Sequence, residues 1–92
     1  MPRRIVFEWD EHNIVHIALH DIEPWEAEDA MRDPERIGSS AYNQGRERRW
    51  ALLGITEAGR ILFVVFTRRR GRVRVVTARD AVGPEQRRYR KG

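Results

Sequence analysis

Apolar residues follow two different periods in the first part of the chain. Ile5, Phe7 and Trp9 alternate with Val6 and Glu8, which predicts a short strand ending at Asp10. From residue 11 to residue 20 the apolar residues recur at helical spacing. Asp10 is suited to cap that run, so the pattern predicts a first helix over residues 11–20.

A second helix and a loop follow. Pro24 suits the first turn of a helix, and the acidic residues after it lie near the positive end of the helix dipole. Asp33-Pro34 ends this helix, which is predicted over residues 24–32. Residues 35–45 show no periodicity and hold Gly, Ser and Asn, so they are expected to form the main loop.

Three strands are predicted in the second half of the chain. They cover residues 47–54, 60–68 and 72–79, and their short connections favour antiparallel neighbours. Residues 61–66 are apolar on both faces, so the second of these strands should be central. Gly83-Pro84 then begins a short, highly charged helix over residues 85–91.

Together these elements predict a single α+β domain over residues 1–92. Its sheet would be antiparallel with three to four strands, two N-terminal helices packed on one face, and a short C-terminal helix. The large aromatic side chains expected to build the core are Phe7, Trp9, Trp25, Phe63 and Phe66. Trp50 is flanked by arginines and is expected to be partly exposed, available for stacking or for a partner.

The net charge of +4 conceals an asymmetry between the two halves of the chain. Residues 1–45 hold four Arg against ten Asp and Glu, a net charge of −6. Residues 46–92 hold thirteen Arg and one Lys against four acidic residues, a net charge of +10. A basic half is typical of a surface that binds a polyanion, because affinity for nucleic acid comes largely from neutralising phosphates.

Composition also excludes several classes of protein. Without cysteine the chain has neither disulfides nor thiolate metal ligands. It lacks an apolar stretch of ~18 residues, so no membrane span and no membrane partner are expected. A reducing cytoplasm is the location that fits these features best.

Several short blocks, in their order along the chain, resemble the BrnT family of toxins. They are residues 7–10, His20 at the end of the first helix, and residues 26–28, 33–34, 45–48, 59–60, 64–68, 74–79 and 85–89. The resemblance covers nearly the whole chain and implies a fold similar to the RelE ribonucleases and an activity on RNA. It also implies a neutralising antitoxin of the BrnA type, through which such a pair binds operator DNA. Many members carry Lys before the helix-ending His and Gly after it, where this chain has Leu19 and Asp21.

RNA cleavage by the 2′-hydroxyl needs a proton acceptor, a proton donor and fixed positive charge around the phosphate, but no cofactor. Arg supplies the charge, because its fork pairs with two phosphate oxygens and stays protonated. The candidates are Arg48, Arg60, Arg68 and Arg79, which lie in strands or at strand ends. Arg68 and Arg79 fall in the family blocks, and strand alternation lets them point to a common face if the hairpin register is favourable. The alternative for each is a solvated charge at a strand end.

Histidine is the natural acid or base near neutral pH, and all three histidines fall on the first predicted helix. His20 is the catalytic candidate because it matches the family position, with Glu47 as the alternative base and Tyr89 as a further proton donor. His12, His16 and His20 are spaced by four residues and form one row along the helix. Two of them could hold zinc, although no convincing third ligand is evident elsewhere.

A further set of residues is expected to hold RNA. This set comprises Arg60, Arg69, Arg70, Arg72, Arg74 and Trp50. Three functions remain open at this point. The first is a metal-independent endoribonuclease toxin, the second is a non-catalytic module that binds RNA or a partner, and the third is a zinc-dependent hydrolase.

Overall fold

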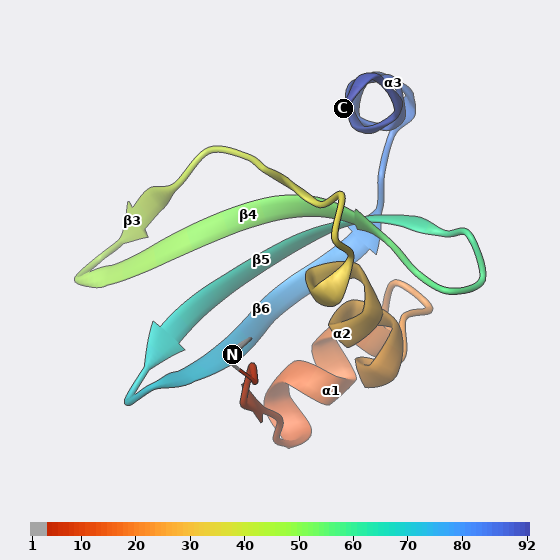
Figure 1. Ribbon diagram of the computed structural model, residues 1–92. Coiled ribbons are helices and arrows are strands. Elements are labelled where there is room, and N and C mark those ends of the chain that lie inside the picture. Colours follow the sequence, from red (N-terminus) through yellow and green to blue (C-terminus); the bar gives the residue numbers. More distant parts are fainter. Residues whose placement is uncertain (1–3) are drawn as a thin grey trace.

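The computed structural model describes residues 4–92, which form three helices and six strands (Figure 1). The helices are α1 (Glu11–Ala18), α2 (Pro24–Arg32) and α3 (Gly83–Lys91). The strands are β1 (Phe7–Glu8), β2 (Ile37–Gly38), β3 (Tyr42–Gln44), β4 (Glu47–Ile55), β5 (Ile61–Arg69) and β6 (Arg72–Asp80). Both N-terminal helices and the three long strands therefore lie where the hydrophobic pattern predicts them.

The sheet is larger and more mixed than expected. Its six strands run in the order β1-β6-β5-β4-β2, with β3 also paired to β4. All neighbours are antiparallel except β1 and β6, which are parallel. The prediction of an antiparallel sheet of three to four strands is wrong. The strand predicted over residues 5–9 is present as β1, but the predicted loop over residues 35–45 contains β2 and β3, which were missed. They have two and three residues, too few to show a period.

The first helix begins where the sequence predicts. The Asp10 carboxylate accepts a hydrogen bond from the backbone amide of Asn13, and the Asn13 side chain accepts one from the amide of Asp10. The helix ends at Ala18, two residues earlier than predicted, and the chain then turns through Asp21. Asp21 has φ of 58°, a left-handed conformation in which Gly is usually found.

One face of the sheet is covered by α1 and α2, and we call it the helix face. Buried apolar side chains fill this interface, namely Ile17, Ile22, Ala27, Ala30, Met31, Leu52, Leu62, Val64, Phe66, Val75 and Ala78. Gly54 allows the close approach of α2, because a Cβ atom there would lie 2.0 Å from the carbonyl oxygen of Ala30. The prediction that Trp25 joins the core is wrong, because 55% of this residue is exposed.

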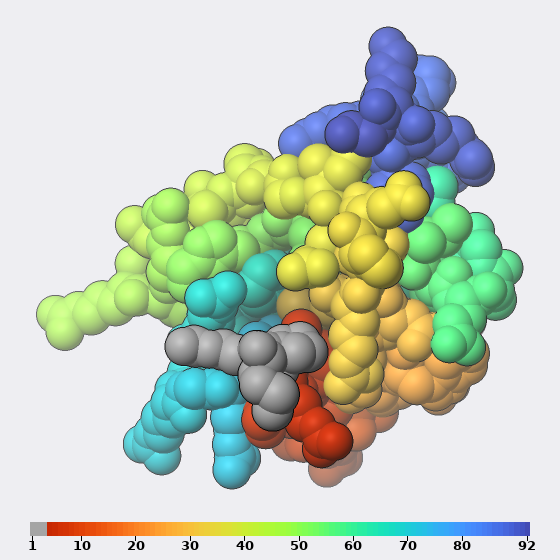
Figure 2. Space-filling model, in the orientation of Figure 1, coloured from red at the N-terminus to blue at the C-terminus, as the bar shows by residue number. Residues whose placement is uncertain are grey.

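The opposite face, which we call the second face, carries α3 at one end. Tyr89 of α3 packs beside Leu53, Ile61 and Phe63, which form a small apolar cluster of their own. No residue of α3 is buried, and Figure 2 shows this helix standing out from the body of the molecule. None of the helices within residues 4–92 has the length and apolar character needed to cross a membrane.

A bulge in β6 decides which residues share a face. Val65 pairs with Thr77, but the next residue, Phe66, pairs with Val75, so that Val76 has no partner on β5. Side chains alternate between the faces of a strand, and the extra residue reverses that alternation. As a result Val75 and Ala78 both point to the helix face, where both are fully buried.

Candidate active site

A groove of about 340 Å³ extends from the second face across β6 to α1, which packs against that strand. Strands β4, β5 and β6 form its floor with Glu47, Arg49, Thr67 and Arg74, and α1 forms one wall with His12 and His16. The groove therefore combines one carboxylate, two guanidinium groups and two imidazoles. These are the group types that can move a proton and hold an anion.

Glu47 and Arg49 point to the same face because they are two residues apart on β4. Their side chains form an ion pair, with 2.9 Å between Arg49 Nε and Glu47 Oε1. This hydrogen bond raises the pKa of Arg49, and Tyr42, its cross-strand partner on β3, adds to the effect. Arg49 is a site residue that the sequence analysis missed, although strand alternation from Glu47 points to it.

Arg74 is fixed on the other side of the groove by two acidic residues. Its guanidinium donates hydrogen bonds of 2.8 and 3.1 Å to the two carboxylate oxygens of Asp10, and it lies 3.5 Å from a carboxylate oxygen of Glu8. The hydrogen bond from Arg74 lowers the pKa of Asp10 to about 2. The same bond raises the pKa of Arg74, with a further contribution from the charge of Glu47 across the groove.

The position of the two histidines is set by Asn13. Its side-chain amide is buried and donates hydrogen bonds to the carbonyl oxygens of Glu8 (3.0 Å) and Val75 (3.1 Å), which ties α1 to the edge of β6. His12 and His16 flank Asn13 on the exposed side of the helix, and both line the groove. The His16 and His20 rings lie 6.1 Å apart, but His20 lies in the turn after α1, outside the helix on which it was predicted. Among residues 4–92, however, no three His, Asp or Glu side chains are grouped so that they could hold a metal ion.

Arg68 and Trp50 lie on the helix face, away from this groove. The guanidinium of Arg68 is 5.4 Å from the centre of the Trp50 ring, and that ring stacks on Phe66 at 6.0 Å. Trp50 thus packs beside a core residue and also contacts an arginine. Arg48, between Glu47 and Arg49 on β4, is exposed and lies 3.4 Å from the Asn43 side chain.

Arg79 lies on the second face but near α3. It donates hydrogen bonds of 2.8 and 2.9 Å to the two carboxylate oxygens of Glu85, which raises the pKa of Arg79 and lowers that of Glu85. Its guanidinium also lies 4.3 Å from the centre of the Phe63 ring. The structure therefore does not bring Arg68 and Arg79 together.

Arg60 lies just before β5, at the end of the strand away from the β5–β6 turn, and its guanidinium contacts the backbone carbonyl of His20. The guanidinium of Arg60 forms ion pairs with Asp80 at 2.8 Å and with Glu26 at 3.1 Å. It also donates hydrogen bonds to the carbonyl oxygens of His20 and Asp21. This arrangement satisfies the donors of Arg60 and fastens the turn between α1 and α2 to the sheet.

Tyr89 anchors α3 to the end of α2. Its hydroxyl donates a hydrogen bond to the carboxylate of Asp33, which also accepts hydrogen bonds from the amides of Glu35 and Ile55. Burial and the Asp33 hydrogen bond together raise the pKa of Tyr89 to about 12. Burial alone would raise the pKa of Asp33, but its hydrogen bonds outweigh that effect and the pKa is lowered.

The remaining predicted residues are on the turn between β5 and β6. Arg69 is paired with Glu8 at 3.1 Å, while Arg70 and Arg72 are exposed. Arg70 and Gly71 both have positive φ, as a two-residue type I′ turn requires. The turn continues from the strands that carry Thr67 and Arg74, so its arginines lie at one end of the groove.

Comparison with protein families gives a match over most of the chain. A family model described as the ribonuclease toxin BrnT of type II toxin-antitoxin systems matches residues 9–85. The matched segment begins just before α1 and ends within α3, so it includes every residue that lines the groove. A search of the curated proteins returns no match.

Proposed function

Because the chain belongs to the BrnT family of ribonuclease toxins of type II toxin-antitoxin systems, we propose that it cleaves RNA in the groove of the second face. One observation carries this proposal. Glu47, two fixed arginines and two histidines of α1 line a single groove. The other predicted catalytic residues lie apart from one another and are held by structural contacts.

Glu47 is the proposed general base. In the free protein its carboxylate is paired with Arg49. A bound phosphodiester is also an anion and competes for the same guanidinium, so binding frees a Glu47 oxygen to accept the proton of the 2′-hydroxyl. The nearby phosphate disfavours the ionised carboxylate and thereby makes it a stronger base. The attacking 2′-oxygen then forms its bond to phosphorus as the bond to the 5′-oxygen breaks.

The other steps fall to the histidines and arginines. His12 or His16, on the opposite wall, protonates the departing 5′-oxygen. Arg49 and Arg74 stabilise the negative charge that develops on the phosphate, since both are held in place before substrate arrives. The product is a 2′,3′-cyclic phosphate, and no metal ion takes part in the proposed reaction.

Binding is assigned to charges around the groove. Arg69, Arg70 and Arg72 on the β5–β6 turn hold the phosphates on one side of the scissile bond. Arg79 holds RNA on the other side once it exchanges Glu85 for a phosphate. We assign Arg60 and Tyr89 to the fold rather than to catalysis, because their side-chain contacts join elements of the structure. His20 is not among the residues that line the groove.

The toxin is expected to act with a BrnA-type antitoxin that neutralises it, and to reach operator DNA only through that partner. The family supports an antitoxin in general, and the basic turn supports an acidic contact surface in particular.

The test is cleavage of a defined single-stranded RNA by the purified protein in excess chelator. Wild-type protein should yield 2′,3′-cyclic phosphate ends, and Glu47→Gln should lower the rate by about a hundredfold or more with RNA affinity retained. Glu57→Gln, on the exposed β4–β5 turn, is the matched control and should cleave normally. Cleavage that needs a metal ion would favour the zinc hydrolase. Binding without cleavage would favour a module that has lost the reaction.

A further inference from the structure

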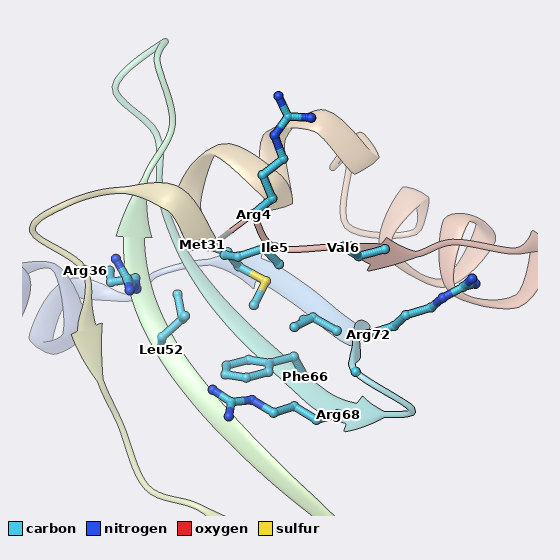
Figure 3. A pocket seen from close by; sticks show the side chains of 11 residues that line it. Arg4, Ile5, Val6, Met31, Arg36, Leu52, Phe66, Arg68 and Arg72 are labelled. Carbon is cyan, nitrogen blue, oxygen red and sulfur yellow. The ribbon is translucent and has the colours of Figure 1, made fainter. Parts of the chain in front are cut away.

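A second hollow, of about 480 Å³, lies on the helix face at the end of the β5–β6 hairpin. Figure 3 shows its lining, with Met31, Leu52 and Phe66 at the floor and Ile5 and Val6 beside them. Val6 is 51% exposed, which is unusual for a residue beside so many buried apolar groups. The hollow is thus an apolar surface that remains open to ligands on one side.

Its rim is entirely cationic. Arg4, Arg36, Arg68 and Arg72 line the hollow, and no acidic residue does. Within residues 4–92 none of these four arginines forms an ion pair with a carboxylate. The catalytic groove differs in this respect, because Arg49 and Arg74 there are already paired with Glu47 and Asp10.

We propose that this hollow receives a segment of the antitoxin in which an apolar side chain is flanked by carboxylates. The inference rests on the proposed function for the existence of that partner. An apolar side chain would cover Val6 and the floor, and the flanking carboxylates would meet the rim arginines. Both features of the hollow are then matched by one ligand.

The lining favours a protein segment over RNA. A nucleobase has donors and acceptors on its edge, and burying them without partners costs free energy. The lining offers such an edge mostly aliphatic carbon, from Ile5, Val6, Met31, Leu52 and Val73. The arginines of the rim offer hydrogen-bond donors but no side-chain acceptor. The side chain of a leucine or phenylalanine has no such requirement.

The position of the hollow also provides a way to inhibit. Arg68 lines it, while Arg69, its sequence neighbour, and Arg74 face the catalytic side of the same hairpin. A partner bound here places negative charge against the hairpin that holds RNA, without entering the groove. Inhibition would therefore come from weaker RNA binding, and Glu47, the proposed general base, would stay accessible.

The experiment uses methyl and amide NMR spectra of the full chain with three probes. Two are short synthetic peptides of equal negative charge, one with leucine and phenylalanine between its glutamates and one with serine at those positions. The third is a 2′-O-methyl RNA oligonucleotide, which cannot be cleaved because the attacking hydroxyl is blocked. The apolar acidic peptide should shift Ile5, Val6 and Met31, while the RNA should shift Thr67, Arg74 and Val76.

Variants separate this site from the catalytic one. Val6→Gln, which removes the apolar contact without adding charge, should weaken binding of the apolar peptide at least tenfold and leave RNA cleavage unchanged. Arg4→Gln with Arg36→Gln should also weaken it, whereas the equal charge loss of Arg87→Gln with Arg90→Gln on α3 should not. Equal binding of the serine peptide, or RNA shifts centred on Ile5 and Met31, would overturn the inference. Loss of cleavage in Glu47→Gln with normal peptide binding tests the proposed function separately.

Discussion

Arg68 and Arg79 lie on opposite faces of the sheet, although the strands that carry them are hydrogen-bonded neighbours. Arg68 is paired across the strands with Val73, and a regular strand would place residues 73, 75, 77 and 79 on one face. The unpaired Val76 reverses that order, so Arg79 points to the same face as Arg74. The bulge thereby separates two arginines that are alike in sequence context and gives them different surroundings.

This separation predicts that the two arginines act independently. Arg68→Ala and Arg79→Ala share no partner, so the loss of transition-state stabilisation in the double variant should equal the sum of the single losses within about 0.5 kcal/mol. The measurement is kcat/KM for RNA cleavage by the four proteins of the cycle. A coupling well above that value would mean that both arginines contact one phosphate.

The contact between α2 and β4 predicts a stability effect at Gly54. In Gly54→Ala the new Cβ would collide with backbone atoms of Ala30, which cannot rotate away, so unfolding should become easier by about 1–3 kcal/mol. Gly38→Ala is the control, because no atom lies within 4 Å of its added Cβ, and its effect should stay within about 0.5 kcal/mol. Urea unfolding followed by circular dichroism gives both values, and equal midpoints would contradict the packing described.

The left-handed residue after α1 predicts a gain in stability. Asp21 has φ of 58°, a conformation that strains a residue with a Cβ atom, so Asp21→Gly should stabilise the protein by about 1 kcal/mol. Asp21→Ala keeps the Cβ and loses the polar side chain that tolerates this conformation, and it should destabilise. Thermal unfolding of the three proteins checks the order. A less stable Gly variant would show that the Asp21 side chain contributes more than the strain costs.

The pair between Asp10 and Arg74 predicts a pH dependence. The pKa of Asp10 is lowered from 3.8 to about 2, so the pair stabilises the fold above pH 3.8 and loses that effect as pH falls through about 2. Asp10→Asn still caps α1 but lacks the charge. Its unfolding midpoint should fall below that of the wild type at neutral pH, and the two should converge near pH 2.

A second variant shows whether Arg74 is the cause. In an Arg74→Gln background, Asp10→Asn should have a smaller pH-dependent effect on the midpoint, because only the backbone amides of Asn13 and His12 then lower the pKa of Asp10. If Asp10→Asn has an equally large pH-dependent effect in both backgrounds, Arg74 is not the main cause of the lowered pKa of Asp10.

Long elements with a clear period could be predicted from the sequence, and elements fixed by tertiary pairing could not. The β5 segment is apolar on both faces because it is central, and Asp10 caps α1 through a local contact with Asn13. The pairing of β1 with β6 depends on residues more than sixty positions apart along the chain. No local pattern in a strand of two residues reveals such a partner.

The site shows the same division. Glu47 was among the predicted bases, and Arg49 follows from it by alternation along one strand. Val76 carries no mark of a bulge, since Val suits a regular strand equally well, and so the faces of β6 could not be assigned in advance. Tyr89 and Arg60 have the right chemistry for catalysis, but only their contacts with Asp33, Glu26 and Asp80 show how they are held.

The ion pairs across the fold also bear on synthesis of the chain. Glu8, Asp10 and Glu26 come from the acidic first half, and they meet Arg69, Arg74 and Arg60 from the basic second half. The ribosome makes the acidic half first, so each arginine strand emerges beside tethered carboxylates, whose effective concentration is on the order of millimolar. A phosphate group therefore reaches Arg69 or Arg74 only in competition with a carboxylate of the same chain.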